Sequence, residues 1–342
     1  MKSRFRLLII LSFLFSVQEG NAQDIHFSQF RETPMLVNPA AAGLFEGSMR
    51  IILNHKSQWA SMGNLYKTLG ASGDMPLFRG KFRQGYLGAG MQFFRDKAGD
   101  SQFGTTAAEF TLSGILPLDE HNKLSVGMQG GIAQRTADVS ALQWGSQYSG
   151  QSYDPGMASN ETNNLSSFIY PDISTGIFYN FSNSDRVSFS QDIFSINAGF
   201  SCYHVNMPEQ KFIISGVEKL QPRWVAFSSA RWDIPDSKFS LIPSFMYMKQ
   251  TPSRELNTGM LIRYRLRSGT KITGFYTESS VAAGCHYRGG DAIVAQVYYE
   301  MSDYALGISY DINTSSYAAA SKAKGGLEIS LRYTRADGAL RK

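Results

Sequence analysis

The five histidines are the first residues to test for chemistry, because histidine is the commonest general base and a frequent metal ligand. Each lies in a different segment of the 342-residue chain: His26, His55, His121, His204 and His286. None belongs to a nucleophile-elbow or His-x-Ser pattern, and no two stand close enough in sequence to make a short pair of metal ligands. We therefore predict that the protein is not an enzyme and uses no metal or other cofactor.

Three arginines are the next candidates. Arg263, Arg265 and Arg267 share one face of a predicted strand, opposite its apolar face. If they face the lumen of a barrel, they could select anionic solutes, as in a porin or substrate channel. Alternatively, they pair with lumenal carboxylates and fill the interior of a narrow barrel, which is the interpretation that we favour. The candidate lumen charges are Arg263, Arg265, Glu328 and Arg332.

The cysteines and one glycine pair give weaker signals. Cys202 and Cys285 are too few for a disulfide scaffold or a four-cysteine zinc site, and the sequence leaves open whether they are bridged. Gly88-Ala89-Gly90 lacks the third glycine and the following helix of a nucleotide-binding loop. It fits a strand that passes close to a neighbour.

The elements that carry these residues are strands. From about residue 48 onward, runs of roughly ten residues alternate apolar and polar side chains. In the run 303–313, Tyr304, Leu306, Ile308 and Tyr310 share one face. Aromatic residues gather near the ends of such runs, as they do at the two interfaces of a membrane barrel. A soluble β-sandwich also alternates, but we favour an all-β fold, a transmembrane antiparallel β-barrel, because so many strands follow an export signal.

The predicted barrel spans residues 47–335 and has about 14 strands. An even number places both barrel ends of the chain on the periplasmic side. By the same parity, the long connections 135–168 and 206–221 are extracellular. The predicted strands are 48–56, 65–75, 85–95, 103–116, 123–134, 169–181, 187–203, 222–233, 238–249, 256–267, 271–288, 291–300, 303–313 and 325–335.

The flanking segments are of other kinds. Residues 1–22 have the features of a signal peptide, with an apolar run from Leu7 to Val17 and a cleavage site after Ala22, so we expect Sec-dependent export. Residues 23–46 contain helix and strand breakers, and residues 336–342 form a basic polar tail. The body contains no run of roughly 18 to 20 apolar residues that could form a membrane-spanning helix. The net charge of +5 is spread thinly, which argues against a nucleic-acid partner.

Several motifs resemble those of a known family. Asp24 with Phe27-Ser28-Gln29-Phe30, then Asn38-Pro39-Ala40 and Gln58-Trp59, are similar to the N-terminal signature of the PorP/SprF family of type IX secretion proteins. Near the end of the chain, Gly307-Ile308-Ser309-Tyr310-Asp311 is similar to that family's closing strands. The resemblance covers essentially the whole mature chain.

The resemblance implies a non-enzymatic role in the outer membrane of Bacteroidetes-type bacteria, in protein secretion and gliding motility. Expected partners are the periplasmic ring of the type IX system or a peptidoglycan-binding OmpA-like protein, outer-membrane lipid, and a secreted adhesin or C-terminal-domain cargo. The protein would support export or surface attachment of that cargo. The alternative that we keep is an outer-membrane porin or solute transporter.

Two groups of residues are candidates for partner contact. The segment 23–46 is expected on the periplasmic side, where it could plug the barrel or dock to a periplasmic protein. Its candidates are Phe27, Gln29, Arg31, Asn38, Pro39 and Gly43. The extracellular loop 135–168 is the expected cargo-facing surface, because Tyr and Trp supply contact area at low entropy cost. Its candidates are Trp144, Tyr148, Tyr153 and Asp154.

Overall fold

The computed structural model describes most of the mature chain. The described residues are 25–58, 66–82, 84–99, 101–138, 142–160, 167–183, 194–213, 216–267, 278–315 and 324–335. The predicted signal peptide, the C-terminal tail 336–342, and residues 187–193 and 271–277 of two predicted strands lie outside this set. In the part that is described, no helix has both the length and the apolar character needed to span a bilayer.

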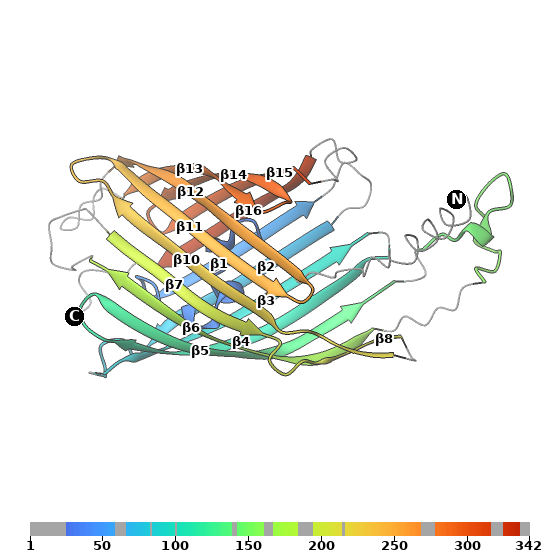
Figure 1. Ribbon diagram of the computed structural model, residues 1–342, viewed down its shortest axis with the longest axis horizontal. Helices are drawn as coiled ribbons and strands as arrows, with labels where there is room; N and C mark the ends of the chain where they lie inside the picture. Colours follow the sequence, from blue (N-terminus) through green and yellow to red (C-terminus); the bar gives the residue numbers. More distant parts are fainter. Residues whose placement is uncertain are drawn as a thin grey trace, which may run out of the picture.

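The strands close into an antiparallel barrel, in which fourteen strands are found among the described residues (Figure 1). This confirms the predicted fold class. Each strand pairs with its neighbour in sequence, and β1 pairs with β16 to close the barrel. The strands are β1 (Met49–Gln58), β2 (Tyr66–Leu77), β3 (Tyr86–Ala98), β4 (Phe103–Pro117), β5 (Asn122–Thr136), β6 (Phe168–Ser182), β7 (Phe194–Tyr203), β10 (Arg223–Asp233), β11 (Phe239–Gln250), β12 (Ser253–Arg267), β13 (Ser279–Arg288), β14 (Ala292–Met301), β15 (Tyr304–Asn313) and β16 (Lys324–Arg335).

The connection between β7 and β10 contains a separate two-stranded hairpin, β8 (Glu209–Ile213) with β9 (Gly216–Lys219). The sequence pattern predicted only a long connection here. The short runs of this hairpin are too brief to show the alternation by which the barrel strands are recognised.

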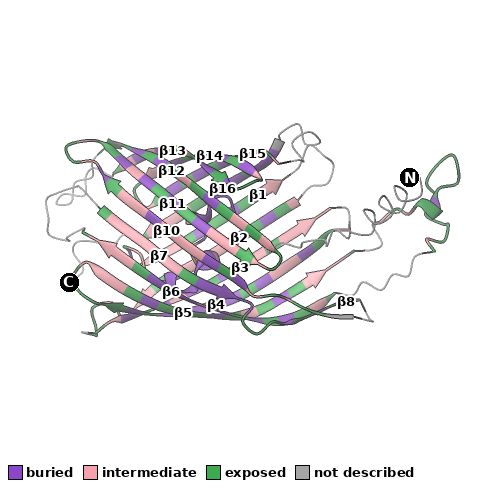
Figure 2. Cartoon of the chain, viewed as in Figure 1, coloured by how far each residue is buried: buried purple, intermediate pink, exposed green. Residues whose placement is uncertain are grey.

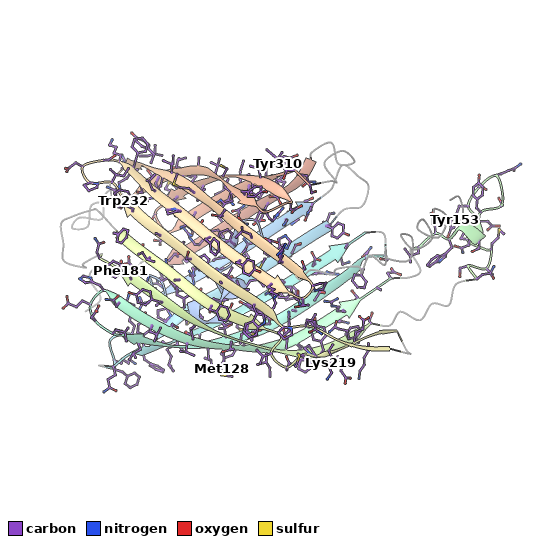
Figure 3. All side chains as sticks on the ribbon, in the orientation of Figure 1. Met128, Tyr153, Phe181, Lys219, Trp232 and Tyr310 are labelled. Atoms are coloured by element: carbon purple, nitrogen blue, oxygen red, sulfur yellow. The ribbon has the colours of Figure 1, made fainter. Side chains whose placement is uncertain are left out.

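The barrel is apolar outside and polar inside. Along β15, the exposed residues Tyr304, Leu306, Ile308 and Tyr310 alternate with buried ones, which include Asp311. Figure 2 shows this alternation of exposed and buried positions along the strands. Figure 3 labels Met128, Trp232 and Tyr310, three of the exposed outer side chains. A soluble sandwich would bury its apolar face, so this inverted pattern distinguishes a membrane barrel from a sandwich.

The two ends of the barrel differ. We call the end with Met49 and Arg335 the proximal end, since these residues pair where β1 begins and β16 ends. The opposite end, at the right in Figure 1, is the distal end. It carries the hairpin and the connection between β5 and β6, which includes the 3-10 turn η5 (Gly145–Gln147). The longest connections therefore gather at the distal end.

Residues 25–48, the lumenal segment, lie within the barrel and form short helical turns. They are η1 (Phe30–Glu32), α2 (Pro34–Val37) and η2 (Pro39–Ala41). Pro34 and Pro39 each stand at the start of a turn, where a missing N–H costs nothing. The Asn38 side chain accepts a hydrogen bond from the Ala40 N–H and caps η2.

Candidate functional site: the lumenal segment and its anchors

The lumenal segment begins at the distal end. The Ile25 carbonyl accepts a hydrogen bond at 3.2 Å from Nη1 of Arg223, the first residue of β10. The His26 carbonyl accepts one at 3.2 Å from Nζ of Lys56, near the distal end of β1. The His26 ring lies 3.6 Å from the Glu255 carboxylate of β12. Three strands thus hold the start of the segment, at the end of the barrel opposite to Met49 and Arg335.

Further in, a buried carboxylate holds the segment by its backbone. The N–H groups of Ser28 and Gln29 both donate to Glu328, at 2.8 and 3.0 Å. The Ser28 hydroxyl donates to Asp311 at 2.9 Å, and Arg288 donates to the same carboxylate at 2.7 Å. Hydrogen bonds to a charged acceptor are stronger than neutral ones, and this network lies away from water. Glu328 therefore works as an anchor of the segment rather than as a partner of the lumenal arginines.

An apolar contact fixes the middle of the segment. Phe30 packs in a buried cluster with Tyr203, Val225 and Met246. Its ring meets that of His286 edge-on, with ring centroids 5.5 Å apart. Phe30 therefore supplies buried apolar area inside a lumen that is otherwise largely polar.

Hydroxyl groups on the barrel wall bind the next carbonyls. The Tyr203 hydroxyl donates to the Met35 carbonyl at 2.9 Å. Serines bind three further carbonyls at 2.7 Å each: Ser201 that of Val37, Ser125 that of Ala40 and Ser113 that of Ala42. Short helical turns leave such groups without partners of their own, so the barrel supplies them.

The segment leaves the lumen at the proximal end. The Gly43 N–H donates to Asp74 at 2.8 Å, and Arg50 forms an ion pair with the same carboxylate. Arg79, in the turn after β2, donates to the carbonyls of Gly43, Phe45 and Gly47 at 3.2, 2.7 and 3.0 Å. Gly43 has a φ of +69° and lies against the backbone of β2 and β3, so that position requires glycine.

Close approach of the segment also explains a glycine in the wall. A Cβ at Gly127 of β5 would lie 2.6 Å from the Ala40 Cα. Gly130, on the outer face of the same strand, would meet nothing closer than 3.9 Å. The segment is therefore in backbone contact with the wall at Gly127.

The candidate lumen arginines lie in ion pairs. Arg263 pairs with Glu300 at 2.9 Å and with Glu278 at 2.8 Å. Arg265 pairs with Asp233 at 3.2 Å. Arg332 pairs with Glu32 of the lumenal segment at 2.7 Å and with Glu300 at 3.1 Å. The positive charges of this face are thereby balanced by carboxylates of the wall and of the segment.

The segment's partner-contact candidates lie mostly inside the barrel. Phe27, Gln29 and Asn38 are at most 3% exposed, and their surroundings are the barrel wall. Pro39 and Gly43 are also buried, and Arg31 is half-buried. Contact of these residues with a periplasmic protein stays a prediction, which their burial in the lumen does not favour.

The cargo-facing candidates lie in a small unit, residues 142–160, that projects beyond the distal end (Figure 3). Gln147 holds this unit together: its side chain accepts from the Trp144 N–H at 3.2 Å and donates to the Met157 carbonyl at 3.0 Å. A bridge pairs Tyr148 with Tyr153, whose exposed fractions are 57% and 37%. Asp154 is exposed and Trp144 is half-buried.

The histidines do not come together. His204 contacts Asp172 at 2.9 Å, and His286 contacts the Ser244 hydroxyl at 2.7 Å. The Ser244–His286 pair spans β11 and β13 across Gly259, whose missing side chain lets the two meet. In the described part of the chain, Nδ1 of His286 has no hydrogen-bond partner, so no carboxylate orients this ring as in a catalytic triad. No group of three metal-ligating side chains occurs there either.

Sequence reasoning missed most of the anchors. Ser113, Ser125 and Ser201 occupy ordinary inward positions of their strands, and Arg79 lies in an ordinary turn. Their partners are backbone carbonyls, which every residue has, so no side-chain motif marks them. A usable signal was glycine inside a strand, as at Gly88 and Gly127, since such a glycine indicates close approach of another backbone.

Comparison with known proteins gives one family match. A family model described as "Type IX secretion system membrane protein PorP/SprF" matches residues 19–333. A search of curated proteins found no match.

Among solved structures, the chain is similar to the toluene transporter TbuX of Ralstonia pickettii, at 10% identity and a TM-score of 0.49, over 90% of this chain and 94% of TbuX. It is also similar to a Pseudomonas aeruginosa FadL homologue, at 10% identity and a TM-score of 0.42, over 87% and 92% of the two chains.

Proposed function

The chain belongs to the PorP/SprF family of type IX secretion system membrane proteins, and from that premise we propose that it is an accessory barrel of the outer membrane that supports export or surface attachment of a secreted cargo or adhesin. A closed antiparallel barrel with an apolar outer face is the form that outer-membrane proteins take. The predicted signal peptide supplies the route to that membrane.

The observation that carries the accessory role over the porin alternative is the filled lumen. A porin needs a continuous aqueous path, whereas this lumen holds a segment that is anchored near its start by Arg223 and Glu328 and at its exit by Arg79. The arginines that could attract anions pair with carboxylates instead. Both features favour a barrel that binds proteins at its two ends over one that conducts solutes.

The two ends suit different partners. The distal unit presents Tyr148 and Tyr153, so we assign cargo contact to that end. The proximal end, with its shorter connections, faces the periplasm in this proposal. There it would meet the periplasmic ring of the type IX system or a peptidoglycan-binding OmpA-like protein.

The first test combines two measurements on the native protein. Purified barrel in planar bilayers should show no steady conductance, while a variant lacking residues 25–42 should conduct. Affinity purification from native outer membranes should recover type IX components or one large surface protein. A stable ion-selective pore in the unaltered protein, purifying alone, would overturn the accessory role.

A matched pair of variants locates the cargo contact. Tyr148→Ser should reduce recovery of the surface protein, because it removes exposed aromatic area from the distal unit. Phe82→Ser is the control, since Phe82 is 64% exposed but lies in the turn after β2 at the proximal end. Equal loss in both variants, or loss only in the control, would contradict distal cargo binding.

A further inference from the structure

The outer wall of the barrel carries three basic side chains at the distal ends of β2 and β3. Lys67 of β2 lies directly opposite Lys97 of β3, and Arg95 lies opposite Leu69 on the same outward face. Side chains directly opposite one another have Cβ atoms about 5 Å apart, and diagonal neighbours about 7 to 8 Å. We call Lys67, Arg95 and Lys97 the basic patch. Its three positive charges lie within reach of a single anionic group.

The acidic residues of the neighbouring strands face the lumen instead. Those of β1 to β4 are Asp74, Asp96 and Glu109. Asp96 accepts a hydrogen bond at 2.6 Å from the Thr68 hydroxyl, and Asp74 and Glu109 are buried on the same inner face. Like charges that lie directly opposite one another repel, so the pairing of two lysines lowers the stability of this part of the sheet. An anion from outside the chain would remove that repulsion.

The same arrangement recurs halfway round the barrel. Lys249 of β11 and Arg254 of β12 lie directly opposite one another, and both are exposed on the outer wall at the distal rim. At the proximal rim of these two strands, the outward pair is Phe239 with Tyr264, whose ring centroids lie 5.0 Å apart. Aromatic side chains suit either interface of a membrane, whereas paired cations suit an interface that is rich in anions.

The basic patch lies at the level of lipid headgroups. On its proximal side, Leu69 and Phe93 are exposed on the outer wall, where they face hydrocarbon. On its distal side, the Lys97 ammonium donates at 2.5 Å to the Gln102 side chain, in the turn between β3 and β4. A charge on the lipid face costs little near the interface, and long basic side chains reach toward the headgroups. The patch therefore marks the border between acyl chains and water.

We propose that the basic patch binds the phosphate groups of a phosphorylated glycolipid in the outer leaflet of the outer membrane. The inference rests on the proposed function in one respect, namely that the distal end faces the cell exterior. Such a lipid presents its phosphates just above its acyl chains, which is the level of the patch. Phosphate oxygens accept charge-assisted hydrogen bonds from ammonium and guanidinium groups. The bound lipid neutralises the pairing of Lys67 with Lys97 and fixes the depth of the barrel in that leaflet.

Binding is tested by titrating the delipidated barrel, in a neutral detergent, with lipid A that carries two phosphates. The bound fraction is measured by native mass spectrometry. The unaltered protein should bind this lipid, and neither fully dephosphorylated lipid A nor inorganic phosphate should displace it at equal concentration. Lys67→Gln combined with Arg95→Gln should weaken binding about 30-fold, the effect of removing two basic side chains near a headgroup. Equal affinity in this double variant, or displacement by either competitor, overturns the proposal.

Two control variants separate the patch from net charge and from folding. Lys81→Gln combined with Lys238→Gln removes two positive charges from turns at the proximal end, and should leave the affinity unchanged. Lys67→Glu places an opposite charge directly across from Lys97, so it should weaken lipid binding without lowering the melting temperature of the barrel. An equal loss of affinity in the proximal variant, or a loss in Lys67→Glu that follows a lower melting temperature, contradicts binding at the patch.

The titration does not depend on which end of the barrel faces outward, so its failure leaves the proposed function intact. Orientation is measured separately on intact cells, with an impermeant maleimide and Gln151→Cys in the distal unit. Cys285→Ala removes the exposed native thiol, and Cys202 is buried. Reaction on intact cells supports an outward distal end. Reaction only after the outer membrane is permeabilised overturns the proposed orientation and the outer-leaflet source of the lipid, even where the purified barrel binds it.

Discussion

The lumenal segment and the distal unit are both short of regular structure, yet they are held in opposite ways. The lumenal segment depends on the barrel: its backbone is bound by Glu328 and by serines of the wall. The distal unit depends on itself, through Gln147 and the bridge between Tyr148 and Tyr153. A segment whose contacts come from the barrel wall can close the lumen. A segment that is held by its own contacts can present a surface beyond the barrel.

The largest expected effect comes from forcing the lumenal segment off the wall. Gly127→Val places side-chain atoms where the Ala40 backbone lies. The lumenal segment should therefore be displaced from β5, while the barrel strands still pair. We expect measurable conductance in planar bilayers and rapid proteolysis within residues 25–42.

Gly130→Val is the control for this change, because it adds the same atoms to the outer face of the same strand. It should leave the lumen closed. A closed lumen in both variants would show that the segment does not fill it by contact with β5.

Loss of the buried carboxylate should have the next largest effect. Glu328→Ala leaves the N–H groups of Ser28 and Gln29 without an acceptor, which should lower the free energy of local opening of the segment by about 3 kcal/mol. Hydrogen exchange of peptides from residues 25–42 measures this opening. Glu278→Ala, which removes a half-exposed partner of Arg263, should change it by less than about 1 kcal/mol.

Removal of the Arg79 hydrogen bonds at the proximal end should destabilise only the nearby part of the lumenal segment. Arg79→Ala loses the hydrogen bonds to the carbonyls of Gly43, Phe45 and Gly47. It should lower the free energy of local opening of residues 43–48 by about 1 to 2 kcal/mol. Faster exchange should appear at residues 43–48 and not at Ser28. Lys81→Ala, in the same turn, provides the comparison. Equal effects of the two variants would mean that the Arg79 hydrogen bonds do not hold residues 43–48.

Weakening of the distal unit should reduce its local order without changing the stability of the barrel. Gln147→Ala removes the hydrogen bonds to Trp144 and Met157. It should lower the free energy of local unfolding of the distal unit by about 1 kcal/mol. Proteolysis within 142–160 should speed up, while barrel melting and conductance stay unchanged. Any change in barrel melting would contradict the view that the unit is held by its own contacts.

The smallest effect concerns a turn that belongs to neither region. The His121 and Asn122 N–H groups donate to the Asp119 carboxylate and hold its pKa below the ordinary value. A depressed pKa stabilises the turn above the pKa of the free carboxyl, and this stabilisation is lost as the pH falls through the lower value. Protection of the amides of residues 119–122, taken relative to their intrinsic exchange rate at each pH, should therefore fall at acid pH, and Asp119→Asn should abolish that dependence.

The barrel itself could be predicted because its signal is local. Alternation has a period of two residues, so each strand can be recognised from its own ten or so residues. The predicted run 303–313, for example, corresponds to β15. For the predicted runs 187–203 and 271–288, residues 187–193 and 271–277 lie outside the described residues, and β7 and β13 are described from Phe194 and Ser279. Their described residues lie within the predicted runs.

The candidate site could be predicted only in part. The motif residues Phe27, Gln29 and Asn38 stood out by resemblance, but their surroundings did not. Ser28 meets Glu328, and Ile25 meets Arg223, across most of the chain length. No periodic pattern links such pairs, because the barrel must close before they face each other.

The amino-acid sequence by itself thus determined the strand count, the inward and outward faces and the family, since these follow from periodicity and from contiguous motifs. Only the tertiary structure decided that residues 25–48 fill the lumen and that Ile25 lies at the end opposite Met49. The physical reason is that the segment has too little regular structure to satisfy its own backbone, so its path is set by the hydroxyls, carboxylates and arginines of a wall that exists only once the barrel has closed.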